Sequence, residues 1–161
     1  MGTKPGANKI IRYLIDIAGY SIERDLIYLE FDRTELKATH KDLSALISKI
    51  VTVAKTRLVL NYSTSLVILA SWSETDSILS LLKVKPLQNL EVTIITFDLQ
   101  KINEIDFQIP KANRTPAFLY QLVEPLANSM IPMHSVLAIG NHVIMMFEPL
   151  FSERALETLL G

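Results

Sequence analysis

The sequence lacks cysteine altogether and contains few glycines and aromatic residues. Its 161 residues include 5 glycines, and aromatic residues make up 7%. Without cysteine there are no disulfides and no thiolate chemistry, which fits the reducing cytoplasm, where we expect the protein to be located. None of the glycines has the spacing of a phosphate-binding loop, and we expect no cofactor.

The sequence also lacks a long hydrophobic run. No uninterrupted apolar stretch reaches the ~18–20 residues that a membrane-spanning helix needs. The lysines of the opening "MGTKPGANK" precede no long apolar core, so we read no signal peptide there. We therefore expect no membrane partner.

Neither half of the chain carries charge of predominantly one sign. The net charge is −1, with 10 Lys and Arg against 9 Asp and Glu in residues 1–80, and 6 against 8 in residues 81–161. A nucleic-acid-binding protein needs a basic surface, and an RNA-binding sheet also needs exposed aromatic residues. We therefore expect no nucleic-acid partner, which leaves small molecules, other proteins or a second copy of the chain.

Apolar residues are abundant, and their spacing predicts the elements of the first half. They make up 49% of the chain, with a mean hydropathy of +0.28. Helical spacing predicts helices over residues 8–19, 39–54 and 73–83, with Thr39 and Ser73 as caps of the last two and Asp42 in the first turn after Thr39. Alternation predicts strands over 57–62, 65–72 and 90–98, whereas 25–31 could be a strand or an extended connector.

The second half follows the same order of elements. A strand is predicted over 104–110, and a helix begins with Thr115 as cap and Pro116 in its first position. Pro125 should kink or end that helix. A hairpin follows, "MHSVLAI" and "HVIMMFE" joined at Gly140-Asn141, and a helix over 152–160 completes the pattern.

An internal repeat links the two halves. A shift of 76 positions places Leu43, Leu46, Ile47 and Ile50 on Leu119, Leu122, Val123 and Leu126 without a gap. The same shift places Val67-Ile68-Leu69 on Val143-Ile144-Met145. Each half therefore reads as helix, hairpin, helix with a further strand nearby, which is the βαββαβ plan of the ferredoxin-like fold used twice. The predicted fold class is α+β.

The stretch "RTPAFLYQLVEPLANSMIPMHSVLAIGNHVIMMFEPLFSERALETL" resembles an ACT domain, most nearly the last such domain of aspartate kinases. Pro116-Ala117 stands where that family usually has Pro-Gly, and "SMIPMHSV" stands for its "INI" segment. The earlier "RLVLNYSTSLVILASWSETDSILSLL" resembles a more diverged copy. The whole chain is also similar to small stand-alone archaeal ACT proteins. The resemblance implies an N-terminal arm, helix and connector over 1–38, a first ACT-like unit over 39–103 and a second over 104–161.

The resemblance also implies a regulatory module that binds a small effector, commonly an amino acid, between paired domains. In the family, ligand contacts come from the turn before the first helix and from the strand after it. The corresponding residues here are Thr115, Pro116, Ala117, Ile131, Met133, His134 and Ser135. The residues just before them, Asn113 and Arg114, are further candidates for ligand contact by their own chemistry. Arg114 and Thr115 offer a guanidinium and a hydroxyl to a carboxylate, or they belong to an ordinary loop and cap. Alanine at 117 limits the backbone where glycine would let a carboxylate approach.

Catalysis and metal binding have little support in the sequence. His134-Ser135 could suggest a nucleophile and its base, but adjacent strand residues point to opposite faces, so we expect these side chains not to meet. His134 and His142 have no further ligand at metal spacing, and we expect no metal site. No acid–base pair stands out, so we expect no enzymatic activity.

Two functions remain open. The first is a homodimeric sensor that binds an amino acid and regulates a partner enzyme through a population shift. The second is a structural or protein-interaction module with no ligand site, for which Ala117 would mark a lost pocket.

Overall fold

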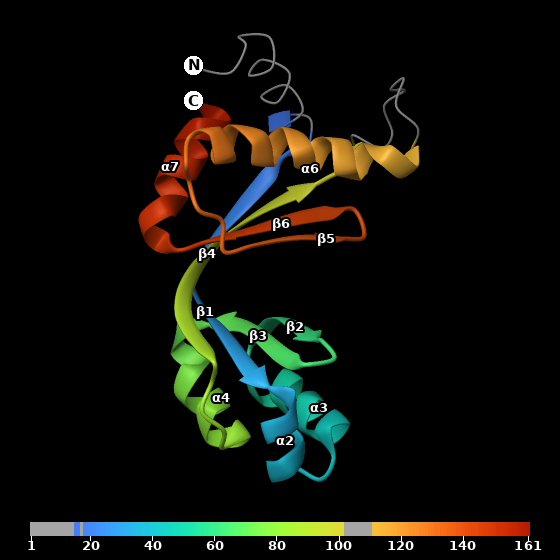
Figure 1. The fold of residues 1–161 in the computed structure, drawn as a ribbon, viewed down its shortest axis with the longest axis vertical. Helices are drawn as coiled ribbons and strands as arrows, with labels where there is room; N and C mark the ends of the chain where they lie inside the picture. Colours follow the sequence, from blue (N-terminus) through green and yellow to red (C-terminus); the bar gives the residue numbers. More distant parts are fainter. Residues whose placement is uncertain (1–14, 17, 102–110) are drawn as a thin grey trace. The chain divides into compact units, whose positions relative to one another are not determined.

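The computed structural model describes residues 15–16, 18–101 and 111–161. They form two compact units (Figure 1). Unit 1 takes its described residues from Met1–Arg24 and Thr93–Gly161, and unit 2 is Asp25–Val92. The predicted bounds 39–103 and 104–161 differ from this division. Residues 25–38 hold Leu29 and Leu36, which lie in the core of unit 2, and residues 93–103 hold Phe97, which lies in the core of unit 1.

Unit 2 combines a sheet with three α-helices. Its elements are β1 (Tyr20–Asp32) from Asp25 on, α2 (Arg33–Thr39), α3 (Leu43–Val53), β2 (Thr56–Asn61), β3 (Ser65–Ser71), the 3-10 turn η1 (Trp72–Glu74), α4 (Thr75–Leu82), and β4 (Gln88–Asp98) as far as Val92. The strand order in this unit is β2-β3-β1-β4. β3 pairs antiparallel with both β1 and β2. The ambiguous stretch 25–31 is thus a strand.

The core of unit 2 lies between that sheet and its helices. Ile27, Leu29 and Phe31 alternate along β1, and all three are fully buried. Alternation places them on one face of the sheet, where they meet Ile50 of α3 and Ile78 of α4 in one apolar cluster. The helical spacing that predicted α3 and α4 therefore identified their buried faces.

Asp42, rather than Thr39, begins α3. Thr39 is the last residue of α2, and α3 starts at Leu43 after an extended residue whose carboxylate accepts a hydrogen bond of 3.1 Å from the Ala45 N–H. The predicted cap of the next helix also moves, because Ser73 lies inside η1 and α4 begins at Thr75. Both Thr39 and Asp42 are good cap residues, and the pattern alone favoured the wrong one.

Replacing Asp42 with alanine should lower the free energy of unfolding by about 1 kcal/mol, since the first amides of α3 would lose their acceptor. Thr39→Ala should change it by less than about 0.5 kcal/mol, because Thr39 is an exposed residue at the end of α2. Urea unfolding followed by circular dichroism measures both. A larger loss for Thr39→Ala than for Asp42→Ala would contradict the observed cap.

Unit 1 also pairs a sheet with helices. Its elements after β4 are α6 (Lys111–Asn128), β5 (Ser135–Ile139), β6 (His142–Phe147) and α7 (Pro149–Leu160). The strand order is β1-β4-β6-β5, with β6 antiparallel to β4 and to β5. The hairpin turns at Gly140, whose φ of 57° suits glycine, so the predicted hairpin is confirmed.

The core of unit 1 is formed by apolar residues from the two chain segments that make up the unit. Phe97 of β4, Leu122 of α6, Met145 of β6 and Ala155 of α7 are all buried in one cluster. Ile15, from the start of the described chain, belongs to the same cluster. The order helix, hairpin, helix therefore occurs in both units, as the repeat predicted.

Three predictions need separate comment. Of the predicted helix 8–19, Ile15, Asp16 and Ala18 are helical and Gly19 lies just after the helix, and the predicted strand 104–110 lies outside the described residues. The helix predicted to begin at Thr115 is already helical from Lys111. It also passes through Pro125 and continues to Asn128.

Candidate functional site

The predicted ligand residues fall into two groups separated by the length of α6. Asn113, Arg114 and Thr115 lie within its first turns, followed by the exposed Pro116 and the half-buried Ala117. The predicted helix start at Thr115-Pro116 was therefore wrong. Alanine at 117 is well suited to its observed helical position.

The second group, residues 131–135, follows the other end of α6. From Ala117 to Asn128 an α-helix rises roughly 16 Å at 1.5 Å per residue. Figure 1 shows α6 crossing unit 1, with the chain leaving its C-terminal end to enter β5. Within unit 1 the two predicted groups are not brought together.

The C-terminal end of α6 fixes the path of the chain into the second group. Met130 adopts a left-handed conformation with φ of 56°, and its N–H donates to the Ala127 carbonyl at 3.0 Å. The Ile131 N–H reaches back to the Leu126 carbonyl at 2.9 Å. This pair of bonds is a Schellman cap. Leu126 and Ile131 are both buried in the core of unit 1, so the buried side chain of Ile131 anchors the segment.

A small hollow lies beside the residues that follow this anchor. It has a volume of about 140 Å³ and is lined by Pro132, Met133, His134, Glu148 and Phe151. Two of the predicted ligand residues thus meet two residues from the start of α7 that the sequence did not single out. The His134 N–H donates to the Met146 carbonyl at 2.8 Å, which holds the backbone of this residue against β6.

The side chains of His134 and Ser135 do meet, contrary to the sequence prediction. Ser135 Oγ lies 3.1 Å from His134 Nδ1. The strand-alternation rule failed because His134 lies in a bend and β5 begins only at Ser135. This contact fixes one edge of the His134 imidazole beside the hollow.

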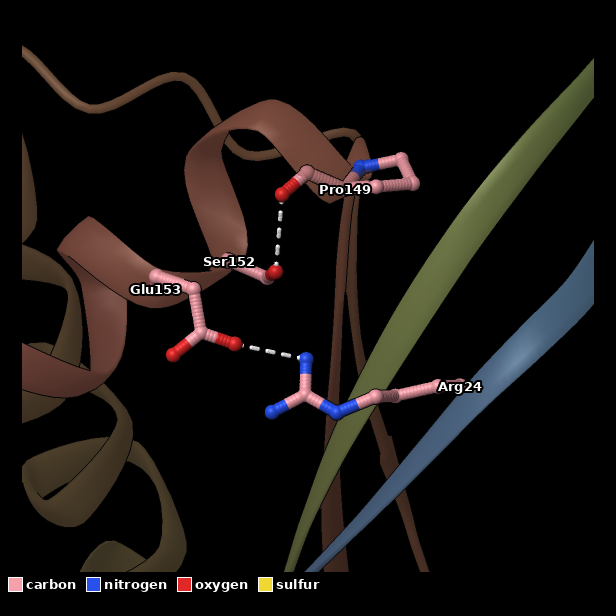
Figure 2. Close-up of polar contacts among 4 residues, drawn as sticks. All are labelled: Arg24, Pro149, Ser152 and Glu153. Carbon is pink, nitrogen blue, oxygen red and sulfur yellow. Dashed lines mark hydrogen bonds and ion pairs between the residues drawn. The ribbon is translucent and has the colours of Figure 1, made fainter.

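Two contacts position the first turn of α7 (Figure 2). Ser152 is buried and its Oγ donates to the Pro149 carbonyl at 2.9 Å. Arg24 of β1 makes an ion pair of 2.7 Å with Glu153. Both side chains of this pair are largely exposed, so the pair contributes at most about 1 kcal/mol. Together the contacts hold the turn that carries Glu148 and Phe151.

Negatively charged, positively polarised and apolar groups lie close together around the hollow. Glu148 is exposed and precedes α7, and its carboxylate makes no capping hydrogen bond. The first-turn amides of α7 give this end of the helix a partial positive charge. Met133 and Phe151 are half-buried and supply apolar surface. An anionic group, a cationic group and a small apolar body can all find partners here.

Glu148 and Phe151 were missed because no local pattern marks them as site residues. Their nearest signal is Pro149 at the start of a helix directly after a strand, which fixes where α7 begins. That signal places Glu148 at a strand-to-helix junction. Its proximity to His134 depends on the pairing of β5 with β6, which the hairpin register supplies.

The described residues give no support for a metal site or a membrane span. Within residues 15–16, 18–101 and 111–161, no group of three or more His, Asp or Glu side chains could hold a metal ion. In the same part of the chain, no helix has both the length and the apolar character needed to cross a bilayer.

The fold is similar to that of aspartate kinase regulatory domains. The regulatory subunit of aspartate kinase from Thermus flavus matches with a TM-score of 0.62 and 7% identity, over 89% of this chain and 95% of that one. The aspartate kinase of Clostridium acetobutylicum matches with a TM-score of 0.65 and 9% identity, over 89% of this chain and 34% of that one.

A third similar structure is that of aspartokinase III from E. coli in complex with lysine and aspartate. Its TM-score is 0.57 at 12% identity, over 87% of this chain and 31% of that one. This chain therefore spans about a third of the length of the whole kinases and nearly all of the separate regulatory subunit. Identities this low show a shared fold. Neither a protein-family model nor a curated protein sequence matches the chain.

Proposed function

We propose that this chain is a non-catalytic regulatory module of two ACT-type, ferredoxin-like units, and that unit 1 binds a small amino acid in the hollow beside His134. The observation that carries the proposal is the meeting of His134, Glu148 and apolar Met133 and Phe151 around a space of about 140 Å³. The proposal keeps Met133, His134 and Ser135 from the sequence prediction as effector-binding residues and adds Glu148 and Phe151.

The strand orders support the ferredoxin-like part of the proposal. In a βαββαβ unit the first strand lies between the fourth and the third, and the second strand is at the edge. The order β2-β3-β1-β4 in unit 2 fits this plan in sequence. The order β1-β4-β6-β5 in unit 1 fits it when β4 is the first strand and β1 supplies the fourth.

An amino acid suits the chemistry of the hollow. Its ammonium group would pair with the Glu148 carboxylate, and its carboxylate would face the His134 imidazole and the amide end of α7. The apolar part of a short side chain would contact Met133 and Phe151. The space is less than half of the ~300 Å³ at which drug-sized pockets begin, which favours a small effector.

Binding would regulate by a shift of population. A ligand that prefers one conformational state of the module stabilises that state and so changes its effect on a partner. We propose a regulated enzyme as that partner and a homodimer as the working form. The structure of E. coli aspartokinase III was obtained with lysine and aspartate bound, which supports testing both amino acids here.

Calorimetric titration of the purified chain with each of the twenty amino acids tests the function. We expect a small subset to bind. His134→Ala and Glu148→Gln should each weaken that binding at least tenfold, because each removes a charge-assisted contact worth about 1.5–3 kcal/mol.

Two variants control for loss of a histidine or a glutamate elsewhere in unit 1. His142→Ala and Glu157→Gln change exposed side chains that do not line the hollow, and both should leave the affinity unchanged. The absence of binding heat with all twenty amino acids would reject the proposed amino-acid sensor. An equal loss of affinity in the control variants would reject this hollow as its site.

The second candidate function is a structural or protein-interaction module. One observation favours it: the Pro116-Ala117 pair lies inside α6, so the turn that corresponds to the family's ligand contact is not at a helix start. If no amino acid binds and the chain still forms a stable dimer by sedimentation, this function replaces the first.

A further inference from the structure

A second hollow lies in unit 2, and none of its lining residues belongs to the proposed amino-acid site. Its volume is about 400 Å³, and it is formed where α2 leads into α3 and where α4 ends. Three lysines from these three places line it: Lys41 between α2 and α3, Lys49 on α3 and Lys83 after α4. We infer that this hollow, which we call the lysine hollow, binds a small organic phosphate.

The charge of the lysine hollow is positive. Asp42 is the only carboxylate in its lining, and that side chain already accepts the Ala45 N–H as the cap of α3. Within the described part of the chain, none of the three lysines forms an ion pair. All three are exposed, so solvent screens each ammonium group, and it is their convergence on one concave space that favours an anion.

The two helix ends that meet at the lysine hollow are held together by His40. Its Nε2 donates to the Leu82 carbonyl at 2.6 Å, which joins the segment after α2 to the last residue of α4. The Lys83 N–H donates to the Leu79 carbonyl at 3.0 Å. Two carbonyls at the negative end of α4 are thereby satisfied, which lessens their repulsion of a bound anion.

Lys83 occupies a position where glycine is the usual residue. Its φ is 57°, a left-handed conformation that is unfavourable for a residue with a Cβ atom. The chain thus places an ammonium group at the rim of the lysine hollow at the expense of local strain. This supports a binding role for the side chain.

The lining selects a class of anion. Lysine ammonium groups are compact point charges that suit phosphate oxygens, and the hydroxyls of Thr39 and Ser80 add hydrogen-bonding groups. Leu46 and Leu81 offer a small apolar wall. No Phe, Tyr or Trp side chain lines the space, and the one imidazole in the lining, that of His40, is held by its bond to the Leu82 carbonyl. The hollow therefore lacks the large aromatic face on which nucleobases stack best. The inferred ligand is therefore a phosphate ester without an aromatic ring.

Calorimetry on the full chain tests this inference with glycerol 3-phosphate, AMP, inorganic phosphate and citrate as probes at one fixed ionic strength. We expect glycerol 3-phosphate to bind at least as tightly as AMP and tighter than citrate. Lys49→Gln and Lys41→Gln should each weaken its binding about tenfold, because each removes one charged hydrogen bond. Lys55→Gln is the matched control, since Lys55 is exposed in unit 2 and lies outside the lining.

Each other outcome overturns a defined part of the inference. Tighter binding of citrate would reject the phosphate, and tighter binding of AMP would reject the non-aromatic ligand. Equal losses for Lys49→Gln and Lys55→Gln would show diffuse screening in place of a site. No heat with any probe would reject the site altogether. Since His134 and Glu148 lie in unit 1, none of these outcomes depends on the proposed amino acid site.

Discussion

Phe97→Ala should lower the free energy of unfolding by about 3–5 kcal/mol, which is a large part of the ~5–15 kcal/mol that stabilises a typical domain. Phe97 is 1% exposed in the core of unit 1. Its ring centroid lies 5.8 Å from that of Phe118 in an edge-to-face arrangement and 6.3 Å from that of Tyr20. Truncation removes buried apolar surface and both aromatic contacts, and it leaves a cavity between β4 and α6.

Tyr120→Ala is the matched control for Phe97→Ala. Tyr120 lies on α6 in the same unit, but its side chain is 64% exposed. Removing an exposed ring should change the free energy of unfolding by no more than about 0.5 kcal/mol. Guanidinium unfolding monitored by circular dichroism gives both values. Similar losses for the two variants would mean that Phe97 is not in the core of unit 1.

Ile50→Asp should cost at least about 4 kcal/mol and leave unit 2 largely unfolded. Ile50 is fully buried in the apolar cluster of unit 2, to which α3, α4 and β1 contribute. An aspartate there would lose the apolar contacts of isoleucine and would place a carboxylate where the lining is apolar. The loss of dispersed amide signals from residues 25–92 in two-dimensional NMR is the expected result.

The adjacent position supplies the control for Ile50→Asp. Val51 lies on the same helix, is 54% exposed and differs little from aspartate in helix propensity. Val51→Asp should therefore keep the native spectrum and change the free energy of unfolding by less than about 0.5 kcal/mol. A native spectrum for Ile50→Asp, or a collapsed one for Val51→Asp, would contradict the observed face of α3.

Strong local patterns explain why much of the fold could be predicted. The β-rich run 65–72 follows the polar pair Ser63-Thr64, and Gly140-Asn141 is a two-residue turn between alternating strands, so both hairpins were found. The repeat at a shift of 76 correctly paired α3 with α6 and β3 with β6. These features depend on near neighbours, which a single sequence displays.

Features decided by competition or by distant residues were not predictable. Thr39 and Asp42 are both competent caps, and the choice depends on where α2 ends. Pro116 is common in first turns, but "KAN" before it favours helix, so α6 extends further back. The hollow beside His134 needs Glu148 and Phe151, which reach it only because β6 returns alongside β5.

The division of the chain has a consequence for biosynthesis. Unit 2 is an unbroken stretch, Asp25–Val92, whereas unit 1 draws on Met1–Arg24 and on Thr93–Gly161. The ribosome therefore synthesises every residue of unit 2 before it synthesises the β5–β6 hairpin and α7 of unit 1. Ile15, at the start of the described chain, must wait for core partners in α6, β6 and α7, which are translated later. Unit 1 therefore has the higher entropy of chain closure and should be the later of the two to acquire its native contacts on a nascent polypeptide.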